Sequence, residues 1–233
     1  MNTTNRDLFS LDPFASPHKL DRELYSLLAQ ASSNLCDWFA ESGGQAPMPD
    51  SFDFPEIYPA KQGVSNKVLL SELQSLMNGS YRPSHPRSLA HLDPPPLSAS
   101  IVGELICAGL NNNLLAEELS PSLSSLERNL CKWFCKKLGF GELSGGVAAS
   151  GGSLSNLMAL VIARNIAGLA SDPRAVFFAS EDCHVSFLKA VRIMGLEKES
   201  LQKIPIDEKG ELKISCLRSS LKKIKSQGKK CFA

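Results

Sequence analysis

The stretch 145-GGVAASGGSLSNLMALV-161 joins a glycine-rich run to an apolar segment, and it decides how this chain is interpreted. Its apolar residues recur at helical spacing: Leu154, Leu157, Met158 and Val161. A helix is therefore expected to begin at about Ser153. Glycines let the backbone approach a ligand closely, and the first N–H groups of a helix have no partner inside it. These groups and the helix dipole favour an anion such as phosphate, and the hydroxyls of Ser150 and Ser153 add donors.

The same run also suits an ordinary loop and helix start, because serine is a preferred N-cap residue. No Gly-Lys-Ser/Thr follows the run, and its glycines do not follow the Gly-x-Gly-x-x-Gly pattern. Nucleotide binding by either of those loops is therefore disfavoured. Taken alone, the run leaves both an anion site and a simple helix cap open.

Beyond this run, apolar strand-like and helix-like segments alternate. The segments expected after the first helix are a strand at 175–179, a helix at 185–194, a strand at 201–206, a helix at 217–226 and the start of a strand at 230–233. Such alternation predicts an α/β fold with a mainly parallel sheet. Ligands of such sheets bind where strands end and helices begin. The loop 180–184, which contains His184, occupies a position of that kind.

The part before the glycine run is predicted to be helical. The expected helices cover residues 18–40, 65–77, 99–108 and 121–138. Between them, residues 47–59 read as an extended arm, and 81–96 is too rich in proline for a helix. The second segment is either a shaped functional loop or a linker.

Composition narrows the function classes. The chain has 233 residues, 43% of them hydrophobic, and a formal net charge of +1, so a folded protein without a general bias towards nucleic acid is expected. We interpret the lysines of 222–230 as a solvated helix face. Neither a leader pattern nor an apolar run of about 20 residues is present, so we expect no membrane partner. The seven unpaired cysteines suit a cytoplasmic protein. Cys131 and Cys135 could clip a metal, but packing is the favoured role, and no metal is expected.

Several ordered stretches together resemble one family. They are SHPRSLAHLDPPPLSASIVGE, NLLAEELSPSLSSLE, ASGGSLSNLMALVIAR and SEDCHVSFLKA. The resemblance is to the pyridoxal-phosphate-dependent amino acid decarboxylases of the group that includes glutamate, aromatic amino acid and diaminobutyrate decarboxylases, and it covers residues 18–233. It implies pyridoxal 5'-phosphate as cofactor and an incomplete fold-type-I large domain preceded by a helical arm. The implied boundaries are 1–98 for the dimerisation arm with a substrate loop, and 99–233 for the first part of the cofactor-binding domain.

The resemblance also implies roles for individual residues. The cofactor residues would be Ser150, Gly151, Gly152 and Ser153 at the phosphate, Asn156 one turn further along, and His184 stacked on the pyridine ring. For His184, an exposed loop position or a helix-capping role is the alternative. The substrate side would include His91, Leu92 and Asn113. For Asn113, a turn or capping role is the alternative. His91 stands where glutamate decarboxylases have glutamine, which argues against glutamate as the substrate.

The implied activity is decarboxylation of an amino acid by a homodimer, in which the cofactor ring accepts the electron pair as carbon dioxide leaves. The family's cofactor-binding lysine and its ring-nitrogen aspartate lie on later strands, and Lys189, Lys229 and Lys230 do not match that context. We therefore assign no catalytic residue in this chain, interpret it as an N-terminal fragment or truncated product, and expect it to be inactive alone. The alternatives are a truncated paralogue that pairs with a full-length subunit, or another fold-type-I lyase or an aminotransferase.

Overall fold

The computed structural model describes residues 14–49, 63–89 and 92–233. The chain forms two compact units, Met1–Asn111 and Asn112–Ala233. Residues 99–111 group with the first unit by compactness, and the predicted domain boundary after residue 98 stays a prediction. The division falls at Asn111, whose left-handed backbone (φ 45°) ends a helix.

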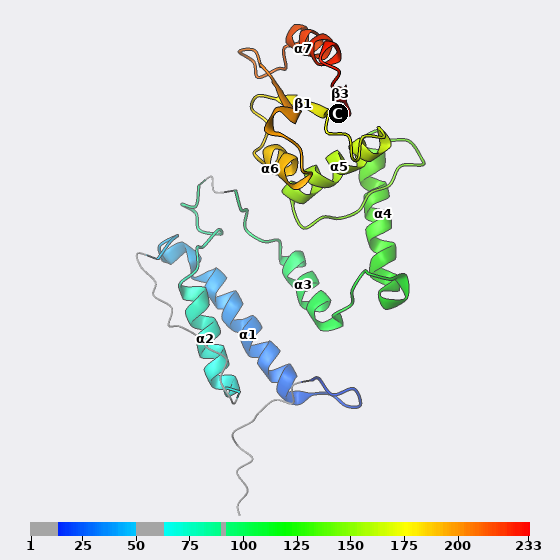
Figure 1. Ribbon diagram of the computed structural model, residues 1–233. Helices are drawn as coiled ribbons and strands as arrows, with labels where there is room; N and C mark the ends of the chain where they lie inside the picture. Colours follow the sequence, from blue (N-terminus) through cyan, green and yellow to red (C-terminus); the bar gives the residue numbers. More distant parts are fainter. Residues whose placement is uncertain (1–13, 50–62, 90–91) are drawn as a thin grey trace, which may run out of the picture. The chain divides into compact units, whose positions relative to one another are not determined.

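The first unit is helical. Its helices are α1 (Arg22–Ala40), α2 (Asn66–Asn78) and α3 (Ser98–Leu110), and the 3-10 turn η1 (Ser42–Gly44) follows α1 (Figure 1). Helix α1 begins later than predicted because the Asp21 carboxylate accepts a hydrogen bond from the Leu24 N–H at 2.9 Å and caps it. Helix α1 packs against α2, whereas none of the residues of α3 is buried.

The buried Arg82 connects the proline-rich segment to the end of α1. Its guanidinium donates a hydrogen bond to the Trp38 carbonyl at 2.7 Å and lies 4.6 Å from the centre of the Trp38 ring. Its backbone N–H donates to the Pro47 carbonyl at 2.9 Å. The described part of the predicted loop is therefore non-helical, as expected, and Arg82 fixes it to the helix pair.

The second unit contains the predicted alternation of helices and strands. In chain order its elements are η2 (Glu117–Leu119), α4 (Pro121–Lys137), α5 (Gly152–Ile166), β1 (Ala175–Ser180), α6 (Ser186–Ile193), η3 (Lys198–Ser200), β2 (Leu201–Ile204), α7 (Ile214–Ser226) and β3 (Lys230–Cys231). The strands form one parallel sheet in the order β2-β1-β3, with Phe177 opposite Leu201 and Ala175 opposite Lys230. This parallel α/β arrangement confirms the predicted fold class.

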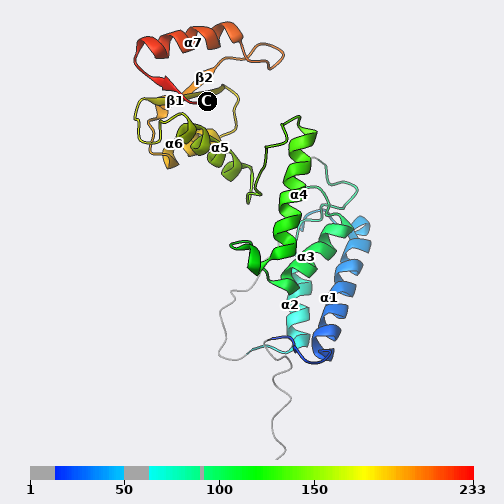
Figure 2. The same cartoon turned by 90° about the vertical axis from the view of Figure 1, so that its right-hand side faces the viewer.

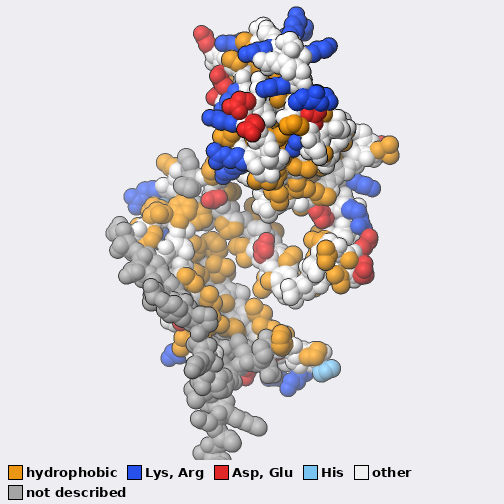
Figure 3. All heavy atoms as spheres, in the orientation of Figure 1, with side chains coloured by type: hydrophobic (Ala, Val, Ile, Leu, Met, Phe, Trp, Pro, Cys, Tyr) orange, Lys and Arg blue, Asp and Glu red, His pale blue; other side chains and the backbone are white. Residues whose placement is uncertain are grey.

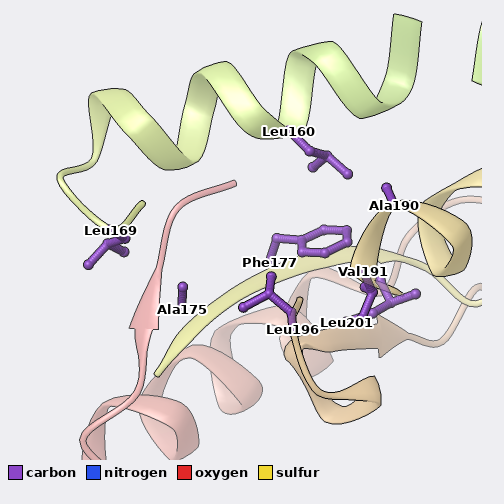
Figure 4. Packing of buried hydrophobic residues seen from close by; sticks show 8 residues of the cluster. All are labelled: Leu160, Leu169, Ala175, Phe177, Ala190, Val191, Leu196 and Leu201. Atoms are coloured by element: carbon purple, nitrogen blue, oxygen red, sulfur yellow. The ribbon is translucent and has the colours of Figure 1, made fainter. Parts of the chain in front are cut away.

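Helices cover both faces of this sheet. Helices α5 and α6 lie on one face and α7 on the other (Figures 1 and 2). Three consecutive residues of β1, Ala175 to Phe177, are buried, as expected for a parallel strand that is covered on both sides. Phe177 is fully buried in the cluster between the sheet and α5/α6, with Leu160, Ala190 and Leu201 among its members (Figure 4).

The boundaries of β2 and α7 also differ from the predictions. Strand β2 ends at Ile204, because Pro205 has no N–H to continue the ladder. Helix α7 begins at Ile214, three residues earlier than expected, directly after a turn closed by the Asp207 N–H donating to the Glu211 carbonyl at 2.9 Å. Apolar spacing alone starts the helix at Leu217, because the first turn of α7 is mostly exposed and adds little periodic signal.

Many hydrophobic side chains remain at the surface, and the lysines of α7 are exposed as predicted (Figure 3). Within the ranges that the structure describes, no helix is long and apolar enough to cross a membrane.

Candidate functional site

The start of α5 presents unpaired backbone donors. Gly151 is its N-cap residue and makes no side-chain capping bond, so neither Ser150 nor Ser153 serves as the cap. The N–H groups of Leu154 and Ser155 both donate to the Gly151 carbonyl at 3.1 Å. Among the described residues, none accepts a hydrogen bond from the N–H groups of Gly152 and Ser153. These two N–H groups are therefore available to an external acceptor.

The space around this turn is open. A Cβ atom added at Gly151 or Gly152 would meet nothing within 4 Å, and Gly151 through Ser155 are all exposed. Two N–H groups and two exposed serines therefore lie at the positive end of a helix of 15 residues. This donor set fits a phosphate, because each donor can bond one of its oxygens without displacing a protein partner.

The segment that leads into the turn is held by α4. The Glu127 carboxylate accepts a hydrogen bond from the Ala148 N–H at 2.8 Å, two residues before Ser150. A Cβ atom at Gly146 would lie 3.4 Å from the Cβ of Cys131, so glycine lets the segment run close to α4. Cys131 therefore packs, as favoured from the sequence. Among the described side chains, no group of three metal-binding types lies together.

The loop after β1 is fixed where it leaves the strand. The Ser180 hydroxyl accepts a hydrogen bond from the Asp182 N–H at 3.2 Å, and the Glu181 N–H donates to the Ile204 carbonyl of β2 at 2.9 Å. The Glu181 carboxylate accepts from the Ile206 N–H at 2.8 Å. These bonds determine where the loop leaves the sheet, and they leave His184 exposed immediately before α6.

A short hydrogen-bonded chain joins the beginnings of α5 and α6. The Asn156 amide donates to the Ser186 hydroxyl at 2.9 Å, and this hydroxyl lies 2.8 Å from His184 Nδ1. The Ser186 N–H also donates to His184 Nδ1, at 3.2 Å. Asn156 lies one turn after the glycine turn, so both predicted parts of the site belong to one end of the α5–β1–α6 unit. Sequence reasoning missed Ser186 because a serine in the first turn of a helix is usually a capping residue.

The residues predicted on the substrate side are not brought to this place by any described contact. His91 lies outside the described residues. Leu92 is 95% exposed and belongs to the first unit. The Asn113 side chain accepts a hydrogen bond from the Leu115 N–H at 3.0 Å, which is the local turn weighed as its alternative role.

One ion-pair cluster lies at the entry to β1 and β3. The carboxylate of Asp172 pairs with Arg174 at 2.8 Å and with Lys230 at 3.0 Å. The hydrogen bonds from Arg174, followed by that from Lys230, hold the pKa of Asp172 well below its usual range. This ion-pair cluster precedes β1, whereas His184 follows β1. We therefore assign the cluster a role in the stability of the fold and not in the candidate site.

Comparison with known proteins identifies the family. The pyridoxal-dependent decarboxylase conserved domain matches residues 51–233. The L-2,4-diaminobutyrate decarboxylase of Acinetobacter baumannii is 28% identical over 192 residues, covering 73% of this chain and 38% of the relative. The aromatic-L-amino-acid decarboxylase of Bacillus atrophaeus is 29% identical over 174 residues, covering 74% of this chain and 36% of the relative. The chain belongs to the pyridoxal-dependent decarboxylase family, which confirms the resemblance and pyridoxal phosphate as the family's cofactor.

Solved structures show the same fold. The structure of Oryza sativa TDC with PLP and tryptamine matches with a TM-score of 0.81 at 20% identity, covering 94% of this chain and 51% of that one. The glutamate decarboxylase domain of a Vibrio parahaemolyticus protein matches with a TM-score of 0.81 at 23% identity, covering 92% of this chain and 51% of that one. The chain thus spans about half the length of these structures, and between 36% and 38% of the two curated relatives.

Proposed function

We propose that this chain supplies the phosphate-holding and ring-holding part of a pyridoxal-phosphate-dependent amino acid decarboxylase. The observation that carries the proposal is the open N-terminus of α5, with its unpaired N–H groups at Gly152 and Ser153, joined through Asn156 and Ser186 to the exposed His184. An anion site and an aromatic ring at the same end of a parallel sheet suit a cofactor that has a phosphate and a flat ring.

Each part of the site would have a distinct task. The N–H groups and hydroxyls of residues 150–153 would bind the phosphate, and the exposed ring of His184 would stack on the cofactor ring and limit its tilt. When bound, the cofactor supplies an electron sink that accepts the electron pair left by departing carbon dioxide. The contribution of these side chains is therefore orientation.

The substrate is proposed as an amino acid of unspecified side chain. The two curated relatives above are named for different substrates, a diamino acid and an aromatic amino acid. His91 in place of the glutamine of glutamate decarboxylases still argues against glutamate, and the roles of Leu92 and Asn113 stay predictions. Family membership favours decarboxylation over the aminotransferase alternative.

We also propose that covalent cofactor chemistry needs residues other than those of this chain. Lys189 is exposed on α6, which begins after His184. Lys230 pairs with Asp172 at 3.0 Å, at the start of β3. Neither lysine has a described contact with residues 150–153 or His184. The chain by itself is therefore expected not to release carbon dioxide from amino acids.

A homodimer is part of the proposal. Helix α3 buries none of its residues, and its apolar side chains Val102, Leu105, Ile106 and Leu110 are between 46% and 59% exposed. An apolar helix of this kind is stabilised when a partner covers it, and a second copy of the chain offers the same surface.

The phosphate site can be tested with pyridoxamine 5'-phosphate, which has the cofactor's ring and phosphate but no aldehyde to react with surface lysines. We expect it to shift the NMR signals of the Gly152 and Ser153 amides of the full chain, and pyridoxamine, which lacks the phosphate, to leave them unchanged. Replacing both Ser150 and Ser153 by alanine removes two hydroxyl donors to a charged group, so affinity should fall by about tenfold or more.

Ser155→Ala is the matched control. Ser155 is exposed on the same turn, but its hydroxyl donates to the Gly151 carbonyl at 3.3 Å and not towards open space. Its replacement should leave the affinity unchanged. Equal affinity for pyridoxamine and its phosphate, or shifts confined to residues away from α5 and α6, would contradict the proposed function.

A further inference from the structure

Ser186 makes different contacts from those of most serines at the start of a helix. It is the first residue of α6 and is 1% exposed, yet α6 has no side-chain capping bond and its N-cap position is taken by Val185. The Ser186 hydroxyl instead contacts Asn156 of α5 at 2.9 Å and His184 at 2.8 Å. The side chain therefore connects two helices and does not cap its own.

The hydrogen-bond roles in this chain can be assigned atom by atom. The Ser186 backbone N–H can only donate, and it points to His184 Nδ1 at 3.2 Å, so Nδ1 is an acceptor and carries no hydrogen. With the Asn156 amide donating to the Ser186 oxygen, the Ser186 hydroxyl hydrogen is free to donate to the same Nδ1. The hydrogen of the neutral His184 ring consequently lies on Nε2, the outer nitrogen.

We propose that Ser186 is a positioning residue that fixes the tautomer and the ring orientation of His184 and couples the ring to Asn156. The backbone N–H and the hydroxyl of one buried residue share the lone pair of Nδ1, so rotation of the exposed imidazole is restricted at that nitrogen. The relevance to a cofactor rests on the proposed function, in which a neutral imidazole stacks better than an imidazolium on a ring that carries positive charge.

The inference also gives Asn156 a definite role. Its amide donates to Ser186, and Ser186 lies on the next helix, so a change at Asn156 should reach His184 although the two side chains are not hydrogen-bonded to each other. Asn156 would then act on the cofactor ring through Ser186 and His184, and not only at the phosphate.

The test uses long-range ¹H–¹⁵N NMR of the full chain without cofactor, which reports which imidazole nitrogen carries the hydrogen. We expect His184 in the wild type to show the Nε2–H form with an acceptor-like Nδ1. In Ser186→Ala the hydroxyl is lost while the backbone N–H at position 186 remains, so the Nδ1 signal should move part of the way towards that of a freely exchanging histidine. Asn156→Ala should move it in the same direction by a smaller amount. Ser215→Ala, at an exposed serine in the first turn of α7, is the matched control and should leave His184 unchanged.

Binding supplies the second readout. Ser186→Ala should weaken pyridoxamine 5'-phosphate by about fivefold, as expected for one lost hydrogen bond. A His184 spectrum that is the same in Ser186→Ala as in the wild type would overturn the inference, and so would equal ligand affinity of the two proteins. If the wild type does not bind the ligand at all, the proposed function fails, while the NMR spectra without ligand still decide the role of Ser186.

Discussion

Replacing Arg164 should loosen the end of the α5–β1–α6 unit that lies opposite the candidate site. Its guanidinium is buried and donates to three backbone carbonyls: Leu169 at 2.8 Å, Met194 at 3.0 Å and Asp172 at 3.4 Å. Met194 is the C-cap of α6, and Leu169 follows the end of α5, so the cation lies where two helices end and their dipoles favour positive charge.

The magnitude follows from these distances. A hydrogen bond from a charged donor contributes about 1.5–3 kcal/mol, and two of the three are short. Taking the lower value for each short bond, Arg164→Met should cost about 3 kcal/mol, because the methionine keeps the packing of the stem but leaves the carbonyls unpaired. Arg164→Lys keeps the charge but loses the planar fork, so about half of this loss is expected.

Amide hydrogen exchange followed by mass spectrometry measures this effect in the second unit alone. Exchange of the buried amides of β1 should become about 100-fold faster in Arg164→Met, which corresponds to about 3 kcal/mol. Arg218→Met is the control, since Arg218 is exposed on α7 and its guanidinium makes no hydrogen bond or ion pair with any described residue. Exchange in Arg164→Met within about twofold of the wild type would refute the reasoning that this cation closes the two helix ends.

Two further predictions concern charge and association. Because Arg174 and Lys230 lower the pKa of Asp172 in the folded chain, its carboxylate stabilises the fold at neutral pH, and this contribution is lost as the pH falls below the ordinary aspartate range. Urea unfolding should therefore find Asp172→Asn less stable than the wild type at pH 7, with the difference shrinking towards pH 3; a constant difference would contradict the assignment. In sedimentation equilibrium, Ile106→Glu on α3 should weaken self-association of the chain, Glu104→Gln should not, and a wild type that stays monomeric at every concentration would refute the homodimer.

The start of α5 could be predicted from the sequence because its signals are local. Glycines, a serine pair and apolar residues at helical spacing all act within one turn, and the helix begins at Gly152, one residue before the predicted start. The phosphate-binding role of this turn stays a prediction. The parallel sheet is likewise predictable, since continuous apolar runs such as Ala175 to Phe177 are typical of strands buried on both sides.

The connection between the two halves of the site could not be predicted in the same way. Asn156 and Ser186 are 30 positions apart, and no local pattern specifies that one amide meets one hydroxyl across two helices. Arg164 is similar, because a basic residue near a helix end is ordinary in sequence, and only the fold shows that Met194 lies within reach of its guanidinium. Contacts between distant segments depend on the packing of α5 against α6, and spacing within either helix says nothing about it.

Backbone polar groups are paired at one end of the α5–β1–α6 segment and partly unpaired at the other, and this difference supports the location of the site. At the end where α5 and α6 terminate, Arg164 donates hydrogen bonds to carbonyls that follow the two helices. At the other end, His184 Nδ1 accepts a hydrogen bond from the Ser186 N–H at the start of α6, but the N–H groups of Gly152 and Ser153 at the start of α5 are without an acceptor among the described residues and lie in open space. Leaving donors unpaired lowers stability unless water or a ligand takes them. A fold that pairs backbone carbonyls with a buried cation at one end, and leaves backbone N–H groups without a protein partner at the start of α5, is therefore suited to bind an anion at the start of α5. His184 lies at that same end.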